Sequence, residues 1–256
     1  CPHAAIRPVL LTDEEKAGAP ASFVTVPAKG LGKDAPAYSF RMQVSPYDCL
    51  GCGVCLTACP AKGALEMVPF ETQREQQENF DRYAMDETLL KKDVISDKTV
   101  KSIQFAKPYF QFSAACAGCA ETTYIKLVTQ LFGDRMYVAN ASGCSSAYGG
   151  AMPMTPYSCD SRGYGPCWEQ SLFEDNAEFA YGFLRAHGSI HGELMIRLEA
   201  LKEQGVAKEA VEDYLANWSD ASKTRTVTDA LIAALEKVEP TEETAFVLRN
   251  KEYLTK

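Results

Sequence analysis

Apolar residues recur every three or four positions along three segments of the second half of the chain. These segments are 193–203 (ELMIRLEALKE), 207–216 and 226–238 (TVTDALIAALEKV). Such spacing places the apolar side chains along one face of a helix, so we predict three amphipathic helices that pack through those faces. The longest apolar runs, such as 230–235 (ALIAAL), are far shorter than a membrane-spanning helix requires, and we expect no membrane partner.

The middle of the chain predicts a helix followed by a strand. Residues 125–131 are largely apolar at helical spacing and end near a glycine, and 135–141 (RMYVANA) alternate weakly, as a strand does. The strand leads into a polar glycine loop at 142–146 (SGCSS). Ligands of open α/β sheets gather at the carboxyl ends of strands, so we expect Cys144 to turn back toward the cysteine pair at 116–119.

The charges in 73–92 predict a solvated, partly helical connector, and 1–67 reads as loop-rich. The whole chain has 256 residues, 46% of them hydrophobic and 23% charged, with a net charge of −8. These values are typical of a globular protein. Nucleic acid binding depends on clustered lysine and arginine, so the acidic balance argues against a nucleic acid partner.

The ten cysteines are the most informative feature of the composition. Most of them lie two or three residues apart, and residues that close rarely bridge each other without strain. The sequence shows no secretory segment, and a chain of this length does not need disulfide crosslinks to fold. Closely spaced thiolates suit a metal ion or an iron–sulfur cluster better.

Residues 49–60 (CLGCGVCLTACP) have the spacing C-x2-C-x2-C-x3-C-P, which is typical of the bacterial ferredoxin loop around a [4Fe–4S] cluster. Gly51 and Gly53 allow the loop to take positive φ angles where it bends. A zinc site or free thiols are the alternatives, but zinc sites usually pair two separate C-x2-C knuckles. Three thiolates would hold three corners of the cluster: Cys49, Cys52 and Cys55.

The first two residues, Cys1-Pro2, echo Cys59-Pro60 at the end of this run. In two-cluster ferredoxins the fourth cysteine of each run ligates the other cluster. We therefore expect Cys1 to complete the cluster of the 49–55 loop, and Cys59 to serve a second cluster whose other ligands precede residue 1. The chain would then be a piece of a longer protein.

A second set of cysteines consists of the C-x2-C pair Cys116 and Cys119, together with Cys144. Three thiolates make an incomplete site for a metal or a cluster, and Cys159 and Cys167 are possible fourth ligands. A thioredoxin-like redox pair is the competing interpretation, although no strand of the right kind leads into it. The residues alone leave these alternatives open.

Four phrases of the sequence together resemble the pyruvate:ferredoxin oxidoreductase (pyruvate synthase) family. The resemblance covers essentially the whole chain and implies an enzyme that oxidatively decarboxylates pyruvate with coenzyme A to acetyl-CoA and CO2. Electrons would pass from thiamine diphosphate, bound with Mg2+, through three [4Fe–4S] clusters to ferredoxin or flavodoxin. The phrases are CLGCGVCLTACPAKGALEM (49–67), FSAACAGCAETTY (112–124), NASGCSSAYGG (140–150) and SLFEDNAEF (171–179).

The resemblance implies an α+β fold of two parts. Residues 1–67 would be the end of a ferredoxin-like [4Fe–4S] domain, 68–111 a connector, and 112–256 the start of an α/β thiamine-diphosphate-binding domain. The family's Gly-Asp-Gly thiamine signature and its pyruvate and coenzyme A domains have no counterpart here, so this internal piece is not expected to be active alone. A homodimer and a cytoplasmic location are further expectations from the family.

The same resemblance assigns the site residues. Glu121 and Cys144 match positions that border thiamine diphosphate, and the fourth ligand of the cluster nearest to thiamine would lie beyond Lys256. Three cysteines match the other ligands of that cluster: Cys116, Cys119 and Cys144. Five match ligands of the ferredoxin-domain pair: Cys1, Cys49, Cys52, Cys55 and Cys59.

Two pairs of residues carry a structural and a chemical interpretation side by side. Cys159 and Cys167 are unexpected in the family and read as free thiols, with a redox-switched disulfide as the alternative. His187 and His191 would share a helix face, but nearby glycines weaken that helix, so packing is favoured over a metal site. A ferredoxin-type electron carrier without catalytic activity, and a zinc-stabilised interaction protein, stay open as other classes of protein.

Overall fold

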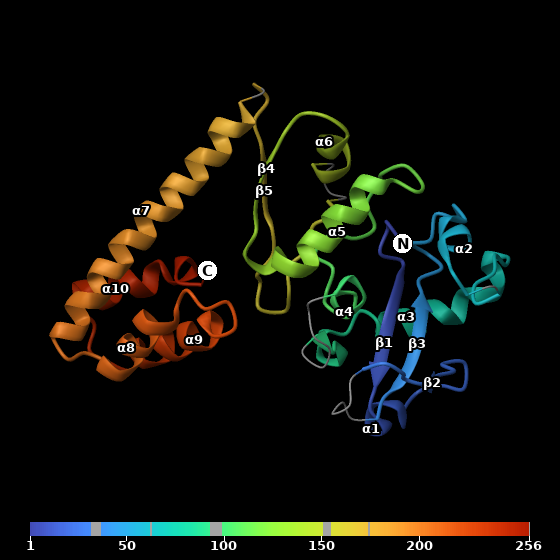
Figure 1. Ribbon diagram of the computed structural model, residues 1–256, viewed down its shortest axis with the longest axis horizontal. Coiled ribbons are helices and arrows are strands. Elements are labelled where there is room, and N and C mark those ends of the chain that lie inside the picture. The colour runs from blue at the N-terminus through green and yellow to red at the C-terminus, as the bar shows by residue number, and fades with distance from the viewer. Residues whose placement is uncertain (32–36, 62, 93–98, 151–154, 174, 256) are drawn as a thin grey trace. The chain divides into compact units, whose positions relative to one another are not determined.

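The computed structural model describes residues 1–31, 37–61, 63–92, 99–150, 155–173 and 175–255. The chain forms two compact units, Cys1–Gln170 and Ser171–Lys256 (Figure 1). Helices and small sheets occur together, which confirms the α+β class at that level. No helix in these residues is long and apolar enough to cross a membrane.

The first unit begins with an antiparallel sheet that the sequence did not predict, because 1–67 reads as loop-rich. Strand β1 (Ile6–Leu11) pairs with β3 (Ser39–Val44), from Ile6 opposite Val44 to Leu11 opposite Ser39, and the short β2 (Val26–Pro27) pairs with the other edge of β3. Helix α1 (Asp13–Lys16) follows β1.

A charged side chain in β1 explains why the strand is hard to recognise. Arg7 is buried, and its guanidinium donates hydrogen bonds to the carbonyl oxygens of Ala4 and Ala84 and to the side chain of Gln111. The ring centroids of Phe80 and Phe112 lie 5.0 and 5.4 Å from the Cζ atom of Arg7. Burial lowers the pKa of Arg7 to about 10, and the charge of Asp48 acts in the opposite direction.

The segment 73–92 is partly helical, as predicted, but only one face of its main helix is exposed to solvent. It contains α3 (Arg74–Tyr83) and η2 (Glu87–Leu89), and η1 (Phe70–Gln73) precedes it. The other face of α3 packs on the antiparallel sheet and closes a small core. The buried members of this core are Val9, Leu11, Phe23, Phe80, Tyr83 and Ala84.

The predicted helix and strand in the middle of the chain are confirmed. They are α5 (Ala120–Phe132) and β4 (Tyr137–Asn140), and β4 pairs in parallel with β5 (Cys167–Gln170). Around them lie α4 (Val100–Ile103), η4 (Gly133–Arg135) and α6 (Cys144–Gly149). The predicted glycine loop 142–146 is therefore shorter than expected, because α6 already begins at Cys144.

Gly133, at the end of α5, has an ordinary helical φ of −57°. Its role is close approach, since a Cβ atom there would lie 2.5 Å from the ring of Tyr109. The second unit contains the three predicted helices, as α7 (Asn176–Glu203), α8 (Lys208–Asn217) and α9 (Thr224–Leu235), followed by α10 (Glu242–Arg249) and η5 (Lys251–Tyr253).

Helix α7 starts 17 residues before the predicted segment and runs through its glycines without a break. The core of this unit is apolar and centres on Leu194, Leu198, Leu201, Tyr214, Leu231 and Leu235. His187 lies against Tyr253 and His191 against Trp218, with ring centroids 4.8 and 4.6 Å apart. Both histidines therefore have the packing role that was favoured over a metal site.

Candidate metal centre

The ferredoxin-type run forms a loop that leads into one short helix. Helix α2 (Val54–Ala58) starts inside the run and carries Cys55, while Cys59 follows its last turn and donates its N–H to the Cys55 carbonyl over 3.1 Å. Gly51 and Gly53 have φ angles of 64° and 72°, so both take the left-handed conformation that the sequence predicted. The glycines let the backbone turn twice between successive thiols.

Cys1 lies with the thiols of this run around one cavity. The cavity encloses about 540 Å³ of empty space, part of it open to solvent, and Pro2, His3 and Met67 also line it. Cys59 is absent from its described lining residues, and the Cys59 Sγ atom donates instead to the Ala61 carbonyl over 3.4 Å. The cysteines that line the cavity are Cys1, Cys49, Cys52, Cys55 and Cys116.

The spacing of these side chains differs from that of a single-ion site. Among the residues that the structure describes, no three His, Cys, Asp or Glu side chains lie close enough together to hold one metal ion. The four thiolates of a [4Fe–4S] cubane bind four different irons at separate corners, so they stand farther apart than the ligands of one ion. Thiols around one cavity are therefore compatible with a cluster.

The C-x2-C loop packs directly on the ferredoxin-type loop. Gly118 has a φ of 74°, and a Cβ atom there would lie 3.0 Å from Cγ2 of Val54, the first residue of α2. Cys116 lines the cavity described above, and Cys119 immediately precedes α5, its N–H bonded to the Cys116 carbonyl over 3.0 Å. The two cysteine loops are thus neighbours, although Cys59 and Cys116 are 57 positions apart in the sequence.

Glu121 and Cys144 are exposed and lie at the starts of two helices. Glu121 is in the first turn of α5, and Cys144 is the first residue of α6. Tyr148 of α6 is buried, and its pKa is raised by burial and by its interaction with Glu121. Burial and the charge of Glu121 also raise the pKa of Tyr157 to about 12.

Tyr148 and Tyr157 therefore border Glu121, and α6 lies beside the start of α5. The sequence analysis missed both tyrosines. The signal for one of them was present, because Tyr148 follows Cys144 by four residues and so shares its face of a helix.

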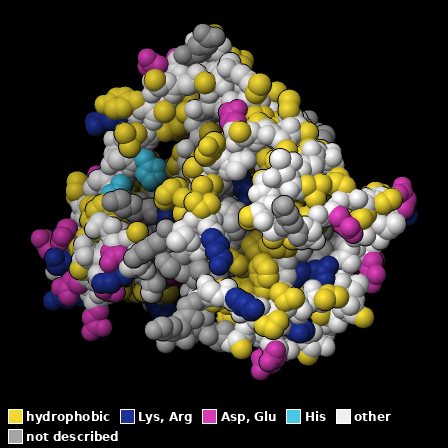
Figure 2. All heavy atoms as spheres, turned by 45° about the vertical axis from the view of Figure 1, so that its right-hand side comes forward, with side chains coloured by type: hydrophobic (Ala, Val, Ile, Leu, Met, Phe, Trp, Pro, Cys, Tyr) yellow, Lys and Arg dark blue, Asp and Glu magenta, His cyan; other side chains and the backbone are white. Residues whose placement is uncertain are grey.

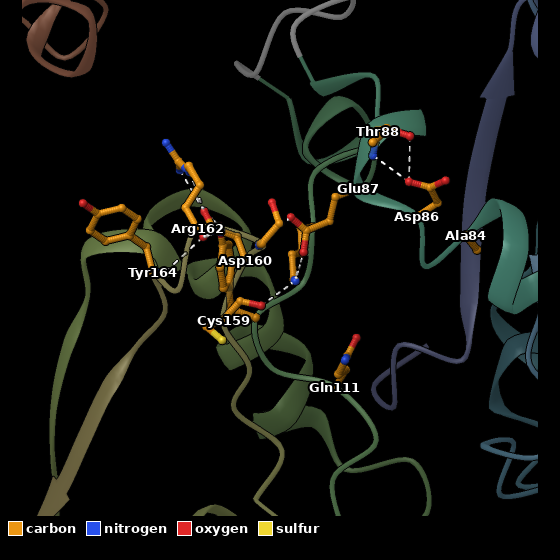
Figure 3. A network of polar contacts seen from close by, with 12 residues as sticks. Ala84, Asp86, Glu87, Thr88, Gln111, Cys159, Asp160, Arg162 and Tyr164 are labelled. Carbon is orange, nitrogen blue, oxygen red and sulfur yellow. Dashed lines mark hydrogen bonds and ion pairs between the residues drawn. The ribbon is translucent and has the colours of Figure 1, made fainter. Parts of the chain in front are cut away.

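The loop that carries Cys159 is fixed by polar contacts (Figure 3). Asp160 accepts hydrogen bonds from the Arg162 guanidinium over 2.8 Å and from the Tyr164 N–H over 3.0 Å. Lys107 bridges Glu87 and the Cys159 carbonyl. Cys159 and Cys167 are exposed, and neither is among the described lining residues of the cavity.

No protein-family model matches the chain. Among known proteins, it is 47% identical over its whole length to the pyruvate:ferredoxin oxidoreductase of Moorella thermoacetica, of which it covers 22%. It is 43% identical over 90% of its length to the pyruvate-flavodoxin oxidoreductase of Klebsiella pneumoniae, covering 20% of that protein. Over 92% of its length it is 42% identical to the mitochondrial pyruvate dehydrogenase [NADP(+)] of Euglena gracilis, covering 13% of it.

The similarity to the Moorella protein extends along the whole chain at a level where common ancestry is clear, although the chain spans only about a fifth of the length of the first two relatives. Two of these three relatives are named after ferredoxin or flavodoxin, and all three after pyruvate. The chain belongs to the family of pyruvate:ferredoxin and pyruvate-flavodoxin oxidoreductases.

Proposed function

We propose that this chain is the electron-transfer part of an enzyme that oxidatively decarboxylates pyruvate with coenzyme A. The products are acetyl-CoA, CO2 and electrons that reach ferredoxin or flavodoxin. The observation that carries the proposal is the position of Cys1, which lies around one cavity with Cys49, Cys52 and Cys55. That is the ligand set that the sequence spacing predicts for one [4Fe–4S] cluster.

The ligand assignments follow from this set. Cys1, Cys49, Cys52 and Cys55 hold one cluster, and Cys59, which is turned toward Ala61, serves a second. Cys116, Cys119 and Cys144 are three ligands of a third cluster, and Cys116 brings it next to the first because it shares the cavity wall. The clusters supply one-electron carriers, and thiamine diphosphate with Mg2+ supplies the electron sink for decarboxylation.

Glu121 and Cys144 border the thiamine diphosphate in this proposal. The buried Tyr148 and the neighbouring Tyr157 lie near the Glu121 carboxylate, and both phenols remain protonated at neutral pH. A protonated phenol next to a carboxylate can donate a hydrogen bond to it and orient it.

The architecture we propose is a ferredoxin-like domain that ends near residue 67, a connector over 68–111, and a thiamine-type α/β domain from 112 onward. The full-length protein works as a cytoplasmic homodimer. Pyruvate and coenzyme A bind to parts of the protein outside this chain.

Iron and acid-labile sulfide analysis of the anaerobically purified full-length protein, with electron paramagnetic resonance after dithionite, tests the proposal. We expect about twelve irons per chain, as three [4Fe–4S] clusters require, and about eight after Cys52→Ser. Cys159→Ser is the matched control and keeps all of them. Zinc without sulfide in the unsubstituted protein would contradict the proposal. Dye reduction that depends on pyruvate and coenzyme A separates this enzyme from a simple electron carrier.

A further inference from the structure

Lys126 is a buried lysine close to the ferredoxin-type cavity. It lies in the second turn of α5 and is only 8% exposed. Thr122, four residues earlier and therefore on the same helix face, lines the cavity with the cysteines. Lysine is almost never fully buried unless a partner compensates its charge.

The partners of Lys126 do not compensate its charge. Its Nζ atom donates a hydrogen bond to the neutral Oε1 of Gln104 over 2.6 Å. Burial lowers the pKa of Lys126 to about 8, and the positive charge of the buried Arg7 lowers it further. In the described part of the chain, the charge that acts on it most strongly is thus repulsive. A buried cation in this position requires a nearby anion.

Cys1 connects Lys126 to the cavity of the thiols. A second, more open cavity of about 1,100 Å³ has Cys1 and Lys126 in its wall, together with Gln104, which follows α4, and Leu127 of α5. Figure 2 shows one face of the molecule, on which hydrophobic side chains lie in a hollow with lysine and arginine beside them.

We propose that Lys126 is the buried counter-charge of the cluster held by Cys1, Cys49, Cys52 and Cys55, and that it raises the reduction potential of that cluster. The inference rests on the proposed function and adds a residue to it. Reduction brings one electron to the cluster, and no bond to Lys126 forms or breaks. A fixed positive charge in a poorly solvated environment favours the more negative, reduced cluster. The cluster in turn favours the protonated ammonium.

A redox titration of the full-length protein, followed by electron paramagnetic resonance, tests this role. Lys126→Gln removes the charge, and Lys126→Arg keeps it. Lys101→Gln is the matched control, because the exposed Lys101 lines the same open cavity. At a fixed applied potential, we expect Lys126→Gln to lower the ratio of reduced to oxidised cluster about tenfold for one of the clusters. For one electron this corresponds to about 59 mV. We expect both other variants to stay within about twofold.

Equal shifts in Lys126→Gln and Lys101→Gln would overturn the inference. If Lys126→Gln loses four of the twelve irons, the iron content of Lys126→Arg distinguishes the two roles. All twelve irons in Lys126→Arg would support a counter-charge. Loss of four irons in both variants would mean that Lys126 only packs. The unsubstituted protein separates this inference from the proposed function. An absence of sulfide there contradicts the function itself, whereas intact clusters with unchanged potentials contradict only the role of Lys126.

Discussion

The two units of this chain are stabilised in different ways. In Ser171–Lys256, leucines from α7 and α9 and Tyr214 from α8 are fully buried against one another, and the Tyr214 hydroxyl donates to the Leu254 carbonyl over 2.8 Å. In Cys1–Gln170, the ferredoxin-type loop has exposed thiols, left-handed glycines and no buried residue in α2. The helical unit thus has its own apolar core, whereas α2 contributes no buried side chain, and we expect the order of the cysteine loops to depend on a bound group.

Loss of the cluster should have the largest effect and should be confined to the first unit. Cys52→Ser removes a ligand of the proposed cluster, and we expect amide hydrogen exchange to become much faster in 49–61 and 113–119, because metal ligation would supply most of the order in such loops. Exchange in α7 and α9 of the full-length protein should not change. Faster exchange in those helices as well would show that the two units are not independent in stability.

A substitution in the core of the helical unit should destabilise that unit alone. Leu198→Ala leaves a cavity in its core, and we expect the free energy of unfolding of this unit to fall by about 2–5 kcal/mol. Chemical denaturation followed by hydrogen exchange in α7–α10 measures it, and Ile196→Ala, at a position 66% exposed, is the matched control. The iron content should stay the same, and a loss of iron would contradict the comparison.

The contact between the two cysteine loops should contribute less to the free energy of unfolding than a buried leucine of the helical core does. Gly118→Ala adds left-handed strain of about 1–2 kcal/mol and pushes a methyl group against Val54. Gly205→Ala is the control, since its φ of 73° is almost the same and no atom lies within 4 Å of its added Cβ. The excess destabilisation of Gly118→Ala over Gly205→Ala, measured by hydrogen exchange, isolates the contact. Equal effects would mean that the loops do not press on each other.

The smallest effect should be the loss of stability of the loop around Cys159 as the pH is lowered. Partial burial alone would raise the pKa of Glu87 and of Asp160, but hydrogen bonds from Lys107, Arg162 and backbone N–H groups lower both. Because the folded pKa values lie below the ordinary ones, the carboxylates stabilise the loop fully above about pH 4.5 and lose this effect as the pH falls through the lowered pKa values.

Amide exchange of Ser161 and Tyr164, corrected for its intrinsic pH dependence, measures this loss of protection. We expect Glu87→Gln to weaken the protection of Ser161 at neutral pH, since the Ser161 N–H donates to Glu87. Exchange in the helical unit serves as the internal control. Protection that stays constant down to pH 2 would contradict the role of these carboxylates.

The sequence predicted those parts in which one physical signal dominates. Helices α8 and α9 follow from apolar periodicity alone, and the turn at Gly51 and Gly53 follows from the ligand spacing. The start of α7 was missed because the part of the helix before residue 193 has exposed apolar residues such as Leu184, 67% exposed, and three glycines that lower helix propensity.

Strand β1 and Lys126 were missed for the same physical reason. A buried Arg7 or Lys126 looks like a surface residue in a sequence, and only tertiary partners reveal otherwise. Those partners are Phe80, Phe112 and Gln104, which come from other segments of the chain. The association of Cys1 with the 49–55 loop, in contrast, was predictable, since the spacing rule for paired clusters already contains it.

The absence of a side chain at Gly133 has a consequence beyond local packing. The Tyr109 ring occupies the space that a Cβ atom would need, and the Tyr109 hydroxyl lies 3.4 Å from Asp160, the residue that organises the Cys159 loop. Any larger residue at position 133 would force Tyr109 to move and would transmit that displacement to a loop more than twenty residues away. Gly133 thus allows the end of α5, the helix of Glu121 and Lys126, to pack closely against Tyr109.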